Sequence, residues 1–256
     1  MSKVILAFSG GLDTSVCVKY LQNLHNLDVI TLTVDVGQNE DFDEIKRISS
    51  ELGAIDHIYI DSKKEFIHDY ITPAIKANAL YQQKYPLATA LARPLIASKA
   101  VEMAKEFNAT SISHGCTGKG NDQVRFDLTI RSLDPSLNII APIRDMNLTR
   151  DKELRYAIET GIKISEIAKK YSIDENLWGR AIEGGLLENL ENEPSSDSLK
   201  YVHQDDTSTE YVTIGFEKGI PVSMNDQYFI TLRHDDLITV PGFCFIPLIR
   251  KRGLKN

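Results

Sequence analysis

Cysteine is scarce in this sequence. Its 256 residues include only Cys17, Cys116 and Cys244, which are far apart along the chain. An odd number of widely spaced cysteines indicates neither a disulfide framework nor a CxxC metal site. We therefore expect the protein to work in a reducing compartment.

Long apolar runs are missing as well. No stretch of the sequence reaches the length needed to cross a bilayer. The first apolar run, Val4 to Phe8, is shorter than the core of a secretory signal, and glycines follow it instead of a cleavage site. These features predict a cytoplasmic protein that has no membrane partner.

An excess of basic residues is also lacking. Lys and Arg number 29 against 36 Asp and Glu, which gives a formal net charge of -7. Proteins that hold nucleic acid through its phosphates carry basic surfaces, so we expect small-molecule partners and no nucleic acid. The 42% apolar and 25% charged residues are those of a globular protein, and the length allows one large domain or one domain with an appendage.

The sequence does have a regular alternation of short apolar runs with segments in which apolar residues recur every three or four positions. The runs predict buried strands, and the periodic segments predict helices. The strands are expected over 4–8, 29–36, 55–60 and 110–113. The helices are expected over 16–24, 42–52 and 93–107. This order predicts an α/β fold with a doubly wound parallel sheet.

The sequence changes in character after residue 150. A helical pattern over 152–171 is followed by the polar stretch 191–198, which we interpret as a linker. Residues 211–216 alternate like a strand, and Lys218-Gly219 could turn that strand into a partner beginning near Pro221.

A glycine loop follows the first predicted strand and leads into the first predicted helix. It reads Ser9-Gly10-Gly11-Leu12-Asp13-Thr14-Ser15. Glycines let a backbone approach phosphate, and the amino end of a helix offers N–H groups without partners. The loop has neither the Walker spacing nor the dinucleotide GxGxxG fingerprint. An ordinary turn with Asp13 or Thr14 as the helix N-cap is the alternative, but the whole string favours a phosphate loop.

A second glycine-rich loop, Gly115 to Gly120, follows the strand predicted at 110–113. Ligands of such sheets bind at the carboxyl ends of strands, so we expect both loops to converge on one crevice. Lys119, Asp122 and Arg125 place both charges beside hydrogen-bonding side chains, which suits a zwitterionic ligand. The alternative is that Lys119 and Arg125 are solvated surface charges.

Two further residues could be given a catalytic interpretation, which we do not adopt. His114 ends a predicted strand, and the six histidines have no metal-like spacing, so we expect it to be structural. Trp178 is expected to pack rather than to stack on a base.

Five segments resemble one enzyme family. The string SGGLDTS is similar to the PP-loop of ATP pyrophosphatases, which cleave ATP between its α and β phosphates. The fuller resemblance is to argininosuccinate synthase. It is carried by AFSGGLDTS at 7–15, VDVGQ at 34–38, YPLATALARPLIA at 85–97, HGCTGKGNDQVRFD at 114–127 and YSIDENLWGRAIEGG at 171–185.

This resemblance implies a PP-loop fold of the adenine nucleotide alpha hydrolase type and an ATP-dependent ligase. Such an enzyme joins citrulline and aspartate to give argininosuccinate, AMP and pyrophosphate through a citrullyl-adenylate. ATP is then the co-substrate, and Mg2+ is expected as the counter-ion of the triphosphate, although the sequence identifies no ligand for it.

The resemblance also implies contacts to each substrate, with no residue assigned as acid or base. Those to ATP come from Ala7, Phe8, Ser9, Gly10, Gly11, Leu12, Asp13, Thr14, Ser15, Val34 and Gly115. Those to aspartate come from Thr117, Asn121 and Asp122. Those to citrulline come from Tyr85, Thr89, Asn121, Arg125, Ser172 and Ala181. Without the resemblance, Tyr85 would be interpreted as a core aromatic residue and Ser172 as a helix N-cap.

The sequence departs from the family at several positions. Phe8 stands where the family usually has Tyr, Ala88 where Gly is frequent, and Ala181 where a Ser meets citrulline. The resemblance fades after 216–225, and Pro241 and Pro247 argue against regular structure beyond it. We expect a nucleotide-binding domain over 1–165, the start of an α+β synthetase domain over 166–226 and a divergent tail over 227–256.

Two alternatives to the ligase follow. With a partial second domain, the chain would be an ATP-binding remnant or regulatory module without turnover, and the homotetramer of the family would not form. A different PP-loop enzyme, acting on transfer RNA or amidating a nucleotide, is disfavoured by the absence of CxxC pairs and by the match at 114–127.

Overall fold

The computed structural model describes residues 2–163, 172–183, 187, 189, 191–193, 211, 213–225 and 227–228. The chain forms two compact units. The first contains the described residues of 1–35, 39–61 and 90–169. The second contains those of 36–38, 62–89 and 170–256.

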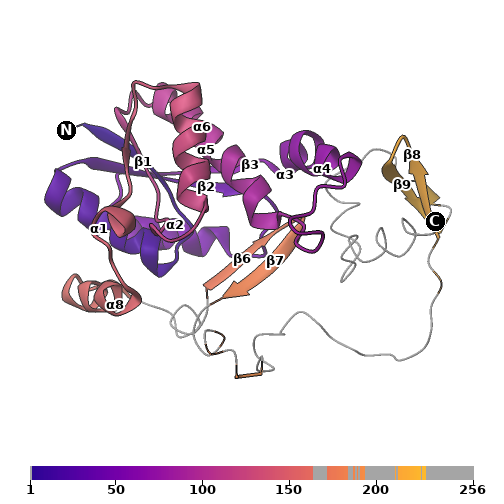
Figure 1. Cartoon of the computed structure of the whole chain (residues 1–256). Helices are drawn as coiled ribbons and strands as arrows, with labels where there is room; N and C mark the ends of the chain where they lie inside the picture. Colours follow the sequence, from indigo (N-terminus) through magenta and orange to yellow (C-terminus); the bar gives the residue numbers. More distant parts are fainter. Residues whose placement is uncertain are drawn as a thin grey trace. The chain divides into compact units, whose positions relative to one another are not determined.

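The first unit is built on a sheet of five parallel strands (Figure 1). The strands are β1 (Lys3–Ala7), β2 (Asp28–Asp35), β3 (Asp56–Asp61), β4 (Ser111–Ser113) and β5 (Asn138–Ile140), in the order β3-β2-β1-β4-β5. The first four lie within one residue of their predicted bounds. The fifth was not predicted from the sequence.

Helices cover the sheet, and strands β1 and β2 at its centre are buried along most of their length. The main ones are α1 (Leu12–His25), α2 (Phe42–Glu51), α5 (Ala88–Glu106), α6 (Asp122–Leu133), α7 (Pro142–Asp145) and α8 (Arg150–Glu159). Val4 and Leu6 are fully buried in a core that includes residues of α1, α2, α7 and α8. Helices α5 and α6 lie on the other side of the sheet (Figure 1). The predicted α/β fold with a doubly wound parallel sheet is therefore confirmed.

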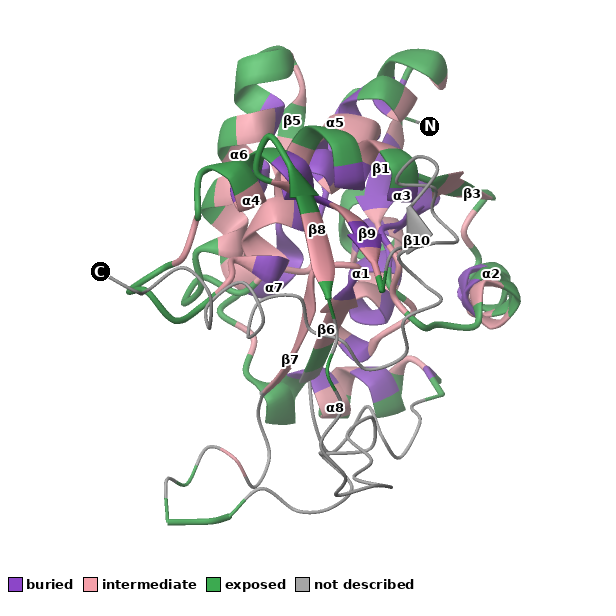
Figure 2. Cartoon of the chain, turned by 90° about the vertical axis from the view of Figure 1, so that its right-hand side faces the viewer, coloured by how far each residue is buried: buried purple, intermediate pink, exposed green. Residues whose placement is uncertain are grey.

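Helix α2 is buried on the side that its repeating pattern of apolar residues predicts. Asp41 caps it by accepting a hydrogen bond from the Glu44 N–H at 3.0 Å, and Ile45 and Ser49 form its buried side. Figure 2 shows buried and exposed positions side by side on this helix. This one-sided burial is the arrangement that a 3.6-residue repeat of apolar positions predicts.

The second unit contains short helices and antiparallel strands. The helical segments are α3 (Lys63–Glu65), the π-helix η1 (Phe66–Ile71) and α4 (Thr72–Lys76). The strands are β6 (Ser172–Asn176), β7 (Gly179–Glu183), β8 (Ile214–Glu217), β9 (Ile220–Met224) and β10 (Gln227–Tyr228). Strands β6 and β7 form a hairpin, and β8, β9 and β10 form a separate sheet in the order β10-β9-β8. The predicted strand pair joined at Lys218-Gly219 is confirmed.

Some sequence predictions fall outside the described residues. These are the end of the helical pattern at 164–171, most of the predicted linker at 191–198, and the tail from 229 onward. Over the part of the chain that is described, no helix combines the length and the apolar character that a membrane crossing requires.

Candidate nucleotide and substrate site

The two glycine loops follow strands β1 and β4, which are neighbours in the sheet. Strand β1 pairs in parallel with β2 on one side and with β4 on the other, and Leu6 lies opposite Ser113. The chain leaves β1 toward β2, whereas the later strands β4 and β5 extend the sheet in the opposite direction. The carboxyl ends of β1 and β4 therefore form the switch point at which open α/β sheets bind ligands.

The first loop has the geometry of an anion-binding turn. Gly10 has a φ of 74°, and a Cβ there would lie 3.2 Å from Ile45 Cγ1. Gly11 is the N-cap of helix α1, and no side chain caps this end of the helix. The alternative in which Asp13 or Thr14 is the N-cap is therefore wrong. A long helix that begins in this way presents unpaired N–H groups to an anion.

Hydroxyl groups hold the same loop together. The Gly11 N–H donates to Ser9 Oγ at 3.3 Å. Thr14 Oγ1 lies 3.3 Å from Ser9 Oγ and donates to the Gly11 carbonyl oxygen at 3.3 Å. Both hydroxyls are therefore fixed beside the start of α1, where they could also reach a phosphate oxygen.

Gly115 brings the second loop against the first. A Cβ at this position would lie 3.1 Å from Thr14 Cγ2 and 3.4 Å from Asp13 Cβ. A side chain at this position would therefore be tightly packed against Thr14, whereas glycine leaves room for the close approach. The structure thus places together three of the residues expected to contact ATP. Val34 lies in β2 and its side chain is buried, so only its backbone is available.

Helix α8 contributes two ionisable residues, Arg150 and Glu153, that the sequence analysis did not identify. Arg150 Nη1 lies 3.1 Å from Asp13 Oδ1 and 3.8 Å from Glu153 Oε2. Glu153 is only 3% exposed. Burial, followed by the nearby Asp13 carboxylate, raises the pKa of Glu153 to about 8. Because α8 is remote from the loop in sequence, no local pattern indicated these contacts.

Asp122, expected to contact aspartate, lies between two guanidinium groups. Its Oδ2 accepts from Arg93 Nε at 2.9 Å, and its Oδ1 accepts from Arg125 Nη1 at 2.6 Å. Arg125 was expected to contact citrulline, whereas Arg93 was missed by the sequence analysis. Thr117 and Asn121 are exposed nearby along the chain and remain accessible to a ligand.

His114 has the structural role expected from the sequence. It is 1% exposed, and its ring stacks on Phe126 with centroids 5.0 Å apart. Its Nε2 lies 3.1 Å from Asp127 Oδ1, and Arg144 Nη1 donates to Asp127 Oδ2 at 2.8 Å. Burial lowers the pKa of His114, so the ring is neutral inside this cluster at neutral pH.

The second unit holds four of the residues expected to contact citrulline. Tyr85 is 38% exposed, which rules out a core aromatic role, and its hydroxyl accepts from the Thr89 N–H at 3.3 Å. Ser172 begins strand β6 and is no helix N-cap. Ala181 lies opposite Asp174 in the β6–β7 hairpin.

The same hairpin is bound to the segment that carries Tyr85 and Thr89. Trp178 Nε1 donates to the Pro86 carbonyl oxygen at 2.6 Å, and Asn176 Nδ2 donates to the Ala88 carbonyl oxygen at 2.9 Å. Trp178 thus has a packing role, as expected. These two bonds join Ala181 and Tyr85 to one framework within the unit.

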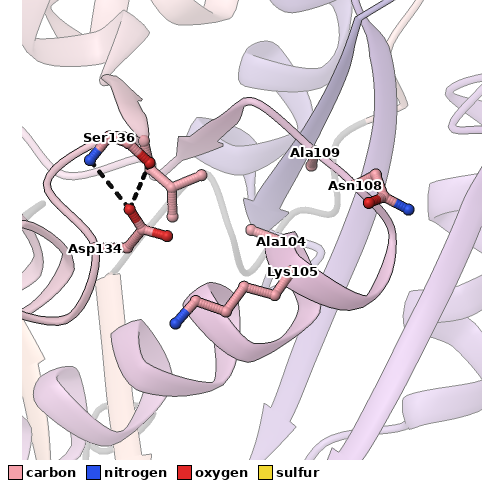
Figure 3. A pocket seen from close by; sticks show the side chains of 7 residues that line it. Ala104, Lys105, Asn108, Ala109, Asp134 and Ser136 are labelled. Carbon is pink, nitrogen blue, oxygen red and sulfur yellow. Dashed lines mark hydrogen bonds between the residues drawn. The ribbon is translucent and has the colours of Figure 1, made fainter.

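Other features of the described residues do not compete with the glycine loops as a site. A depression of about 380 Å³ lies beside the amino ends of β4 and β5, opposite the switch point (Figure 3). Its lining consists of Ala104, Lys105, Asn108, Ala109, Asp134, Ser136 and Leu137. Within the described residues, no three His, Cys, Asp or Glu side chains gather as metal ligands.

Two family models match the chain. Residues 3–163 match the arginosuccinate synthase N-terminal HUP domain. Residues 171–238 match the arginosuccinate synthase C-terminal domain. Together the two models cover most of the sequence.

Curated proteins named argininosuccinate synthase are similar to the chain. That of Dictyoglomus turgidum is 55% identical over 87% of this chain and 56% of its own length. That of Pyrococcus furiosus is 53% identical over 88% of this chain and 55% of its own length. That of Methanothermobacter thermautotrophicus is 54% identical over 89% of this chain and 57% of its own length. The chain thus spans little more than half the length of these relatives.

Proposed function

The chain belongs to the argininosuccinate synthase family, and on this premise we propose that it joins citrulline and aspartate while cleaving ATP to AMP and pyrophosphate. One observation carries the proposal: Gly115 of the second loop lies against Asp13 and Thr14 of the first, at the switch point of the sheet. The two loops provide N–H groups and hydroxyls for a triphosphate.

The reaction has two steps. The ureido oxygen of citrulline attacks the α-phosphorus of ATP, and pyrophosphate leaves from the first loop. The amine of aspartate then attacks the ureido carbon, so that AMP leaves and takes the citrulline oxygen with it. Positioning and charge stabilisation supply most of the rate in such phosphorus chemistry.

The chain's own groups would divide this work. The N–H groups at the start of α1, with Ser9 and Thr14, would hold the leaving pyrophosphate. Thr117, Asn121 and Asp122 would hold aspartate. Tyr85, Thr89, Asn121, Arg125 and Ser172 would hold citrulline. Mg2+, as the counter-ion of the triphosphate, would be bound mainly by phosphate oxygens.

The division into domains follows from the same proposal. We assign 1–165 to nucleotide binding, 166–226 to the start of the synthetase domain and 227–256 to a divergent tail. The small number of cysteines supports a cytoplasmic location.

Transfer of labelled oxygen tests the reaction directly. Citrulline carrying 18O in its ureido group, incubated with aspartate, ATP and Mg2+, should give AMP that contains the label together with pyrophosphate. Omission of aspartate should prevent argininosuccinate from forming. Unlabelled AMP would point to hydrolysis of ATP and would contradict the proposal.

A second candidate function is supported by Ala181. Its methyl group offers no hydrogen bond where the family has a serine that meets citrulline, which favours an ATP-binding module without turnover. Binding of ATP by folded protein, without citrulline-dependent pyrophosphate release, would establish this alternative.

A further inference from the structure

Asp13 is the acidic residue of the first loop, and helix α8 holds it. Asp13 lies in the first turn of α1, which packs against α8. Its Oδ1 accepts a charge-assisted hydrogen bond from Arg150 Nη1 at 3.1 Å. A carboxylate beside a phosphate loop repels the ligand, so a cation at this position removes a penalty on binding.

Glu153 is the second partner of Asp13. Its side chain is buried almost completely, and Oε2 has no hydrogen-bond partner among the described residues. Arg150 Nη1 lies 3.1 Å from Asp13 Oδ1 and 3.8 Å from Glu153 Oε2, so the two carboxyl groups meet at the same guanidinium. A hydrogen bond with the Asp13 carboxyl is one of the causes that raise the pKa of Glu153. Two carboxyl groups can share such a bond only when one of them is protonated. The proton belongs to Glu153, because Glu153 is buried whereas Asp13 is about 40% exposed and paired with Arg150.

We propose that Glu153 is a positioning residue of the ATP site: its carboxylic acid donates to Asp13 and, together with Arg150, keeps this corner of the phosphate loop free of net negative charge. With Glu153 protonated, the charges of Arg150 and Asp13 cancel. An ionised Glu153 would leave one negative charge beside the polyphosphate. This inference rests on the proposed function, since it assumes that the loop holds ATP.

Within the described part of the chain, the cation that contacts Glu153 is Arg150, whose Nη1 lies 3.8 Å from Oε2. Helix α1 presents Asp13 and the buried Cys17, and α8 presents Arg150. Burial and the two carboxyl groups raise the pKa of Cys17 well above its ordinary value, so that thiol stays neutral. Cys116 of the second loop also acts on Cys17. Among these neighbours of Asp13 and Glu153, Arg150 is therefore the one that carries a positive charge.

The pH profile of ATP binding tests the proposal. ATP affinity would be measured from about pH 7 to about pH 9 for the wild type, for Glu153→Gln and for Glu159→Gln, an exposed position on α8. We expect affinity in the wild type and in Glu159→Gln to fall by up to about tenfold per pH unit above the pKa of Glu153. Glu153→Gln should give a flat profile, because its amide donates to Asp13 without titrating. Parallel profiles in all three proteins would overturn the proposal.

A measurement without nucleotide separates this inference from the proposed function. Carbon NMR of wild-type protein labelled at the glutamate carboxyl should show one carboxyl that titrates near pH 8, absent from Glu153→Gln. The titration itself is measured on the wild type without ATP, and Glu153→Gln serves only to assign the signal. If it is present and ATP does not bind, the proposed function fails and the protonated pair stands. If every glutamate titrates in the ordinary range, the inference fails whatever the protein binds.

Discussion

Arg93 on helix α5 donates its Nε–H to Oδ2 of Asp122, at the start of helix α6, over 2.9 Å. The second carboxylate oxygen of Asp122 accepts from Arg125. The side chains of Arg93, Asp122 and Arg125 are all more than two-thirds buried. Dissolved salt therefore screens the attraction between Asp122 and the two arginines less than it screens a surface ion pair. Arg93 therefore fixes the direction of a carboxylate that is proposed to contact the aspartate substrate.

Replacement of Arg93 tests that relationship. Arg93→Ala should raise the KM for aspartate about fivefold, corresponding to about 1 kcal/mol, because Asp122 loses one of its two partners. The KM for ATP should change little. Steady-state pyrophosphate release provides the measurement. The matched control is Glu102→Ala, which removes the half-exposed carboxylate paired with Lys99 on the same helix. Equal effects in both variants would show that Arg93 is not specific to aspartate.

Gly115→Ala should separate the two loops. The added methyl would lie 3.1 Å from Thr14 Cγ2, so Thr14 of the first loop would have to move by a few tenths of an ångström. We expect ATP affinity to fall by about tenfold or more, since a misplaced phosphate loop loses several hydrogen bonds together. Calorimetry with ATP measures the change. Gly120→Ala, whose methyl would meet only the Asp122 nitrogen at 4.0 Å, should have a smaller effect; similar losses would contradict the explanation by close approach.

Trp178→Phe should loosen the segment that carries Tyr85 and Thr89. The variant keeps an aromatic ring but removes the donor to the Pro86 carbonyl oxygen. Loss of this bond should lower the free energy of unfolding by about 1–3 kcal/mol. Hydrogen exchange should show faster exchange at the Thr89 amide. Ile173→Thr, at a position of the same hairpin that is 39% exposed, is the control. Protection of the Thr89 amide that stays the same in Trp178→Phe would argue against the proposed framework.

His114 should make the protein sensitive to acid. Its pKa is lowered in the folded state, so the unfolded state binds more protons as the pH falls below about 6.5. Stability should therefore be full at neutral pH and decrease on acidification. His114→Gln should be less stable at about pH 7, because the ring packing on Phe126 is lost, but should show a smaller further loss at about pH 5. Thermal unfolding at the two pH values measures both effects.

Ala181→Ser tests the role proposed for that position in citrulline binding. A new hydroxyl should lower the KM for citrulline by about two- to tenfold, as expected for a net hydrogen bond of about 0.5–1.5 kcal/mol. The KM for aspartate in the same variant serves as the internal control. An unchanged KM for citrulline would remove Ala181 from the proposed set of contacts.

The elements that the sequence predicted well are those with a strong local pattern. Strands β1 and β2 are rich in Val, Ile and Leu and are buried along most of their length, because helices cover both faces of the sheet. Strand β5 was missed because it contains only three residues, and none of them is fully buried. The β6–β7 hairpin was missed because charged residues such as Glu175 and Arg180 interrupt any clear apolar alternation.

The same distinction applies to the site. The glycine loops could be predicted because Gly10 and Gly115 are required by local backbone geometry and close approach. The partners of the loop residues could not. Arg93 reaches Asp122 from another helix, and Arg150 reaches Asp13 from α8, so these pairs exist only once the tertiary structure has formed.

The central position of β1 also determines the order of assembly during protein synthesis. One edge of β1 pairs with β2 (Asp28–Asp35), which is synthesised soon after β1. The other edge pairs with β4 (Ser111–Ser113), which is synthesised much later. The nascent chain must therefore keep an unpaired edge beside the first glycine loop until the later strand leaves the exit tunnel. A chaperone that recognises unpaired strands would find its target in this interval. The two glycine loops thus come together in one late, long-range folding step.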